Sequence, residues 1–154
     1  MATIEKSIEV NVPVETAYTQ WMQFEEFPRF MDGVKEVTKI DDDHLHWKVE
    51  IAGMEKEWDT QFIEQTLDRR IAWTSPSGAI NSETVTFHRL SPDKSKIELQ
   101  VAYDPASIIK HAENASGLMS LRVRGDLERF KHFIETRTKV AKPFETSTGS
   151  KPPP

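Results

Sequence analysis

Apolar and polar side chains alternate along most of the chain with a period of two, which is typical of strands that bury one face. The alternation predicts a first strand over residues 3–12 and about six further strands within residues 34–103. The six correspond to residues 34–40, 45–51, 55–65, 71–74, 80–90 and 97–103. Short turns rich in Asp, Gly, Pro and Ser separate them, so consecutive strands should pair mostly antiparallel.

Two regions depart from this period and are predicted to be helical. Residues 13–22 place apolar side chains at helical spacing after a proline, and a second short helix, kinked or begun at Pro28, should follow. Residues 114–138 return to helical spacing as one long amphipathic helix. Its apolar face consists of Met119, Val123, Leu127, Phe130 and Ile134.

The order of these elements predicts an α+β fold of the helix-grip type. A curved antiparallel sheet of about seven strands wraps around the long C-terminal helix, and the two short helices after the first strand close one end. Such a sheet need not collapse completely onto its helix, so an internal cavity is expected. We assign residues 1–138 to this single domain. Residues 139–154 are rich in Pro, Ser and Thr and are predicted to be a disordered tail.

Composition narrows the class of protein further. A length of 154 residues suits one domain with a sizeable core. The formal net charge of −5 argues against nucleic acid or an anionic membrane as the main partner. The absence of cysteine excludes disulfides, thiol catalysis and thiolate metal sites. Charges interrupt every apolar run near the N-terminus, so we expect a cytoplasmic protein without integral membrane association.

The hairpin over residues 45–62 decides which side chains face inward. We predict that Gly53 and Met54 are the central residues of its turn. This register pairs Trp47 with Thr60 and turns Trp47 and Trp58 toward the same inner face, while the charged residues between them take the outer face.

Apolar side chains of this inner face and of the short helices are candidates for lining a pocket that accepts an apolar or aromatic ligand. The alternative is ordinary core packing, since aromatic rings supply much of the buried area of any core. The sequence leaves both interpretations open. The candidates are Phe27, Phe30, Met31, Trp47, Trp58, Trp73, Phe87, Tyr103 and Met119.

Four polar residues could add chemistry to such a pocket. Glu83 and Asn81 share the parity of Val85, which predicts that both face the apolar side. There Asn81 could orient a ligand oxygen, and Glu83, its pKa raised by burial, could move a proton. Tyr103 or Arg122 could polarise a ketone, and Arg122 could hold an anionic or enolate group. The alternatives are a wet position at the rim for Glu83 and Asn81, and a solvated or ion-paired Arg122.

The remaining groups of polar residues in the sequence do not predict a metal site or a cofactor. His44 and His46 share a strand face beside residues 41–43, which are all aspartates. Parity places this face on the solvent side, where the hairpin register supplies no third ligand. The sequence shows no Ser, His and Asp arrangement and no phosphate-binding glycine loop.

Four segments of the chain resemble the START-like, helix-grip superfamily. Within it, they are similar to the bacterial polyketide cyclase/dehydrase-like and coenzyme-Q-binding-like branch, often called SRPBCC proteins. The segments are VNVPVETAYTQWMQFEEFPRFMDGVKEV, LHWKVEIAGMEKEWD, RIAWTSPSGAINSETVTFHRL and GDLERFKHFIE. The resemblance covers residues 4–135, nearly the whole predicted domain.

The resemblance implies a container for hydrophobic ligands that different members use for lipid transfer, hormone binding, polyketide cyclisation or quinone handling. We therefore expect binding of a hydrophobic or aromatic small molecule, such as a lipid, quinone or polyketide-like compound, by a monomer or weak homodimer. One alternative is a genuine aromatase/cyclase or dehydratase, for which the candidate catalytic residues are Glu83, Tyr103 and Arg122. Another is a stress-related or interaction domain without a ligand. No diagnostic catalytic motif of the family can be assigned to numbered positions.

Overall fold

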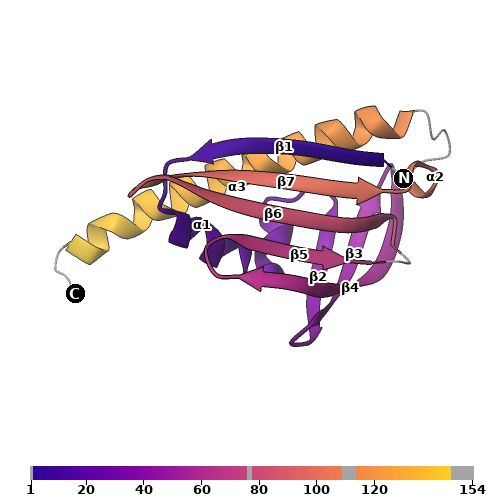
Figure 1. Ribbon diagram of the computed structural model, residues 1–154, viewed down its shortest axis with the longest axis horizontal. Helices are drawn as coiled ribbons and strands as arrows, with labels where there is room; N and C mark the ends of the chain where they lie inside the picture. Colours follow the sequence, from indigo (N-terminus) through magenta and orange to yellow (C-terminus); the bar gives the residue numbers. More distant parts are fainter. Residues whose placement is uncertain (1, 76–77, 109–113, 147–154) are drawn as a thin grey trace.

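The computed structural model describes residues 2–75, 78–108 and 114–146, with side chains described as far as Arg137. Its strands are β1 (Ala2–Val10), β2 (Val34–Asp41), β3 (His44–Ile51), β4 (Met54–Thr66), β5 (Arg70–Thr74), β6 (Ile80–Ser91) and β7 (Lys94–Tyr103). They form one antiparallel sheet in the order β1-β7-β6-β5-β4-β3-β2. Figure 1 shows β2 and β3 running at a steep angle to β1 and β7, so the sheet is strongly curved.

The helices are α1 (Val14–Trp21), η1 (Phe24–Arg29), α2 (Pro105–Ile108) and α3 (Ala115–Thr146). The long helix α3 crosses the concave side of the sheet, and α1 and η1 occupy one end (Figure 1). The predicted α+β helix-grip fold is therefore confirmed. The second short helix is a 3-10 helix that contains Pro28, and α2 is an element that the sequence pattern did not predict.

The long helix extends further than its predicted end at residue 138. It continues to Thr146 and so includes the first part of the stretch whose Pro, Ser and Thr content predicted a tail. The remainder of the predicted tail, residues 147–154, lies outside the described residues.

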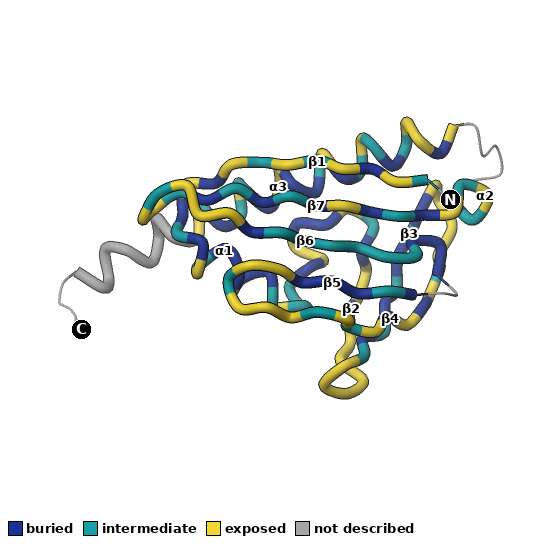
Figure 2. Tube along the Cα trace, in the orientation of Figure 1, coloured by how far each residue is buried: buried dark blue, intermediate teal, exposed yellow. Residues whose placement is uncertain are grey.

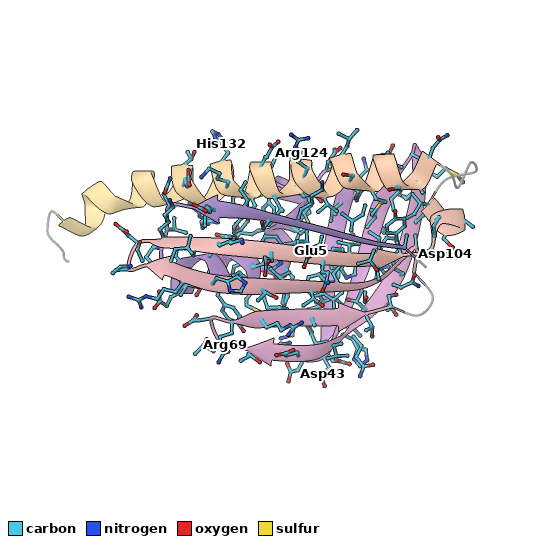
Figure 3. The ribbon with its side chains drawn as sticks, turned by 45° about the horizontal axis from the view of Figure 1, so that its top comes forward. Glu5, Asp43, Arg69, Asp104, Arg124 and His132 are labelled. Atoms are coloured by element: carbon cyan, nitrogen blue, oxygen red, sulfur yellow. The ribbon has the colours of Figure 1, made fainter. Side chains whose placement is uncertain are left out.

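Burial follows the predicted alternation. In β3 and β7 a buried residue follows each less buried one along almost the whole strand (Figure 2). The five apolar positions predicted for the long helix are all buried against the sheet, which confirms its inward face. On the opposite side of α3, Arg124 and His132 point away from the sheet (Figure 3). None of the helices in the described part is long and apolar enough to cross a membrane.

The predicted register of the β3–β4 hairpin is wrong by two residues. Ile51 pairs with Met54, so the turn consists of Ala52 and Gly53, with φ of 53° and 80°. Positive φ at both central residues is the geometry of a type I′ turn, which matches the twist of the flanking strands. A shift of two residues preserves parity. Trp47 therefore still faces inward with Trp58, which is now its direct cross-strand partner.

Candidate functional site

A small cavity lies between the inner face of the sheet and α3. Its volume is about 20 Å³, which is space for about one water molecule and far below the range of small-molecule sites. The wall is apolar apart from three charged residues, one on β6 and two on α3. It consists of Met31, Val34, Trp47, Val49, Trp58, Ile80, Glu83, Leu99, Val101, Met119, Arg122, Val123 and Asp126.

Glu83 projects from β6 into this cavity. Its strand neighbours are Trp73 on β5 and Val101 on β7, and no hydrogen bond joins its carboxyl group to another described residue. Burial raises the pKa of Glu83 to about 8; the charge of Asp126 adds to the rise and that of Arg122 opposes it. The carboxyl group is therefore mostly protonated at pH 7 and can donate a hydrogen bond into the cavity. The predicted inward orientation of Glu83 is correct.

Asp126 is the second carboxyl group of the wall, and it is not among the site residues predicted from the sequence. Its Oδ1 accepts hydrogen bonds from Arg129 Nη2 at 2.6 Å and from the backbone N–H of Asp32 at 3.0 Å. Burial raises its pKa, whereas Arg122 and these hydrogen bonds oppose the rise. A signal did exist, since Asp126 lies seven residues after Met119 and so occupies the apolar face of the predicted helix.

Arg122 lies between the cavity and the outside of the molecule. It lines the cavity and also an open hollow of about 410 Å³ that β2, the β3–β4 turn and α3 form. Its Nη1 donates to the carbonyl oxygen of Glu50 at 3.3 Å. Gly33 makes this approach sterically feasible, because a Cβ there would press on the Glu50 carbonyl and lie 3.0 Å from Arg122 Nη1. Gly33 also has a φ of 80°, which favours glycine.

Trp47 and Trp58 form the aromatic part of the wall. The indole Nε1 of Trp47 donates to Thr60 Oγ1 at 2.8 Å, which satisfies the only polar atom of that ring and fixes its orientation. The Trp58 ring packs closely over Gly78, where an added Cβ would lie 2.8 Å from its Cγ. Both rings are thus held rigidly, with their inward surfaces beside the cavity.

Six of the residues predicted to contact a ligand lie outside the cavity wall. Four of them are aromatic side chains that pack into a solid cluster at the η1 end. Phe27 contacts the rings of Trp47 and Trp73, with centroids 5.6 and 6.5 Å apart, and Trp21 contacts Phe30 at 5.8 Å. The six are Phe27, Phe30, Trp73, Asn81, Phe87 and Tyr103.

Asn81 departs from its predicted orientation because β6 contains a bulge. The pairing with β7 shifts between Ile80 and Ser82, so Ile80 takes the inward position and lines the cavity. The side-chain amide of Asn81 instead donates to the carbonyl oxygens of Ser75 and Gly78, at 3.5 and 3.3 Å. Asn81 therefore supports the β5–β6 connection.

The two histidines of β3 lie on the outer face and bind acids individually. His46 contacts Asp59 at 2.6 Å and Glu57 at 2.8 Å, while His44 contacts Asp41 at 2.8 Å. The hydrogen bond to Asp59, followed by that to Glu57, raises the pKa of His46. Across the described part of the chain, no group of three or more His, Cys, Asp or Glu residues is arranged to hold a metal ion.

Comparison with known proteins connects this architecture to a family. A family model described as "Polyketide cyclase / dehydrase and lipid transport" matches residues 10–132. A protein of Streptomyces lincolnensis is 46% identical over 138 residues, which cover 89% of this chain and 92% of that protein. That relative is described as an uncharacterized 17.2 kDa protein in the melC2-rnhH intergenic region.

Solved structures share the fold at low identity. A START superfamily protein from Mycobacterium smegmatis has a TM-score of 0.71 at 15% identity, covering 87% of this chain and 97% of that one. The Zhui aromatase/cyclase from Streptomyces sp. R1128 has a TM-score of 0.73 at 13% identity, with coverage of 89% and 95%. The resemblance to the START-like superfamily is thus confirmed at the level of fold.

Proposed function

Because the chain belongs to the polyketide cyclase / dehydrase and lipid transport family, we propose that it binds a hydrophobic or aromatic small molecule between the sheet and α3. One observation carries the proposal. The carboxyl group of Glu83 faces an otherwise mostly apolar cavity without a hydrogen-bond partner among the described residues. Glu83 is partly buried, and a polar group removed from water without a partner is costly. A lipid, quinone or polyketide-like ligand with a carbonyl or hydroxyl group would satisfy it.

Binding requires the cavity to expand. A space of about 20 Å³ cannot hold a ring system, so side chains of the wall must move. Met31 and Met119 are suited to this, because the unbranched methionine side chain adapts to irregular spaces. The hollow beside Arg122 provides a path from solvent to the same wall. Ligand binding is therefore coupled to rearrangement between α3 and the sheet.

Mass spectrometry tests this proposal directly. Freshly purified protein should show, under native conditions, an added mass that disappears on denaturation. Protein without such a ligand should gain thermal stability with at least one of menadione, naringenin and lysophosphatidylcholine, since a ligand that binds only the folded state raises its melting temperature. Neither an adduct nor a shift with any probe would support the ligand-free interaction domain instead.

The protonated Glu83 favours a second candidate function, a dehydratase-type lyase. With a β-hydroxy ketone, Glu83 would donate its proton to the leaving hydroxyl group as the C–O bond breaks. Asp126 would accept the α-proton, so the products are an enone and water. Arg122 would polarise the ketone oxygen. Tyr103, the third candidate from the sequence, lies outside the cavity wall and has no part in this scheme.

Glu83→Gln separates the two functions. Under the dehydratase hypothesis, the variant keeps its affinity for a β-hydroxy ketone probe but loses formation of the enone, followed by absorbance. Equal loss of binding and turnover, or no turnover in the unchanged protein, favours a carrier. Glu55→Gln is the matched control, because Glu55 is exposed on β4 and should affect neither quantity.

A further inference from the structure

We infer that the ligand of this cavity is an aromatic carboxylate, with its carboxylate group bound by Arg122 and its ring between the cavity-lining tryptophans. The inference rests on the proposed function and names the chemical class of its ligand. It begins from the unusual position of Arg122, which borders both the interior cavity and the open hollow.

The guanidinium group of Arg122 has hydrogen-bonding capacity to spare. Arginine carries five N–H donors in a planar fork that matches the two oxygens of a carboxylate. The one hydrogen bond that the structure gives this side chain is the 3.3 Å contact to the Glu50 carbonyl oxygen, which is long for a charged donor. An entering carboxylate can replace that contact with two shorter ones.

The other cations nearby are already paired with acids. Arg129 binds Asp126 at 2.6 Å, and Lys35 binds Glu50 at 3.1 Å. Arg122 forms no ion pair with any carboxylate that the structure describes, including Asp32, the remaining acid of the hollow. The positive charge at the boundary of the cavity is therefore the one that an anionic ligand would neutralise.

Glu83 reinforces this preference for an anion. Its protonated carboxyl group presents a hydrogen-bond donor to the same cavity that Arg122 lines, and Arg122 is near enough to influence its pKa. The Asp126 carboxylate is bound by Arg129, so Arg122 is the cation of the cavity wall that has no carboxylate within ion-pair distance among the described residues. A carboxylate can accept from both Arg122 and Glu83, whereas a cationic ligand would be repelled.

The apolar part of the wall determines the rest of the ligand. Trp47 and Trp58 are direct cross-strand partners, and both border the cavity. Their rings lie on the same inner face, opposite Met119 and Val123 of α3. Flat aromatic rings pack favourably against such faces. In an aryl acid the carboxylate is bonded directly to the ring, which keeps both groups within one small site.

Calorimetric titration with 2-naphthoate and its neutral amide, 2-naphthamide, tests the inference on the whole chain. At pH 7 the protein should bind the naphthoate about tenfold more tightly, the effect of one charge-assisted contact. Arg122→Gln should keep the affinity for naphthamide and bring the two affinities within about threefold. Arg122→Lys should retain part of the preference, which separates loss of charge from misfolding.

Arg124→Gln is the matched control. Arg124 lies two residues away on the outer side of α3 (Figure 3), 4.0 Å from Glu128, and its loss should leave the preference unchanged. Equal wild-type affinities for acid and amide, or a preference that survives Arg122→Gln, would overturn the inference while leaving the proposed function intact. If naphthamide and the neutral probes described above all fail to bind, the proposed function itself is contradicted.

The pH dependence gives an independent readout. The charged groups that act on Glu83 are Asp126 and Arg122 of α3. Around the adjoining hollow lie Arg129, Asp32, Lys35 and Glu50, and the strand neighbours Trp73 and Val101 do not titrate. The naphthoate stays ionised between pH 7 and 9, whereas Glu83 loses its proton in this range. The preference for naphthoate should therefore fall with rising pH, and Glu83→Gln should abolish the fall. A fall that persists in Glu83→Gln contradicts the role of Glu83.

Discussion

The two ends of the interior differ in how they are filled. At the η1 end, the Trp21 ring packs against those of Phe30 and Phe130, with centroids 5.8 and 4.6 Å apart, and no residue of this group borders the cavity. At the other end, Glu83 and Arg122 lie beside a space of about 20 Å³. At the aromatic end the rings pack closely against one another. At the polar end charged side chains line a cavity, and the packing of a core does not need such charges. The contrast leads us to expect that substitutions at the aromatic end mainly affect stability, whereas those at the polar end affect the proposed binding.

The largest expected loss of stability comes from creating a cavity among the rings of the aromatic end. Trp21 is fully buried and contacts four other rings. Trp21→Ala should therefore lower the free energy of unfolding by about 3–5 kcal/mol, measured by urea denaturation. Trp21→Phe should cost clearly less, because it keeps a ring and removes an indole N–H that has no partner among the residues that the structure describes. A loss below about 1 kcal/mol for Trp21→Ala would mean that this end is not the stabilising one.

At the polar end, the ionisation of Glu83 should lower the free energy of unfolding as the pH rises. Glu83 has its pKa raised to about 8 in the folded protein, from an ordinary value of 4.5. A raised carboxyl pKa means that the folded state binds the proton more tightly than the unfolded chain, so stability is greatest below pH 4.5 and declines toward pH 8. For this one group, the decline is on the order of a few kcal/mol.

Urea denaturation from pH 5 to 9 measures this contribution as the difference between the unchanged protein and Glu83→Gln. The variant should gain stability relative to the unchanged protein as pH rises, and the difference should level off above pH 8. Glu55→Gln, at an exposed position on β4, serves as the control for general effects of charge. A difference that does not change with pH would show that Glu83 titrates normally and is not desolvated.

Asp126 should have a smaller effect on the free energy of unfolding than Trp21 or Glu83. Asp126→Asn removes the charge that binds Arg129 at 2.6 Å, but Arg129 is 44% exposed and water can replace part of the interaction. Burial raises the pKa of Asp126, so removing its charge also removes a desolvation cost that partly offsets the lost hydrogen bond. We expect a net loss of only about 1 kcal/mol at pH 7 by urea denaturation. The same substitution should lower the pKa of Glu83, because the charge of Asp126 contributes to raising it. An unchanged pH profile in this variant would contradict that electrostatic connection.

The sequence predicts those features of the two ends that depend only on the periodicity of apolar residues. The faces of the strands follow from parity alone, so Trp47 and Glu83 were placed correctly. Asn81 was placed wrongly because a bulge breaks the parity next to it, and bulges leave little trace in an apolar pattern. Asp126 was detectable from helical spacing. The size of the cavity could not be predicted from the sequence. It depends on how closely rings such as those of Phe27 and Trp73 pack together in three dimensions.

The smallest expected effect concerns the β3–β4 turn, which borders the hollow beside Arg122. Ala52 adopts a φ of 53° there, and a side chain with a Cβ is disfavoured in this conformation. Ala52→Gly relieves the strain but frees the unfolded chain, so the net gain should be about 0.5–1 kcal/mol by urea denaturation. Since Ala52 lies outside the cavity wall, the preference for naphthoate over naphthamide should not change. A lost preference would mean that turn geometry, and not only Arg122, controls access to the polar end.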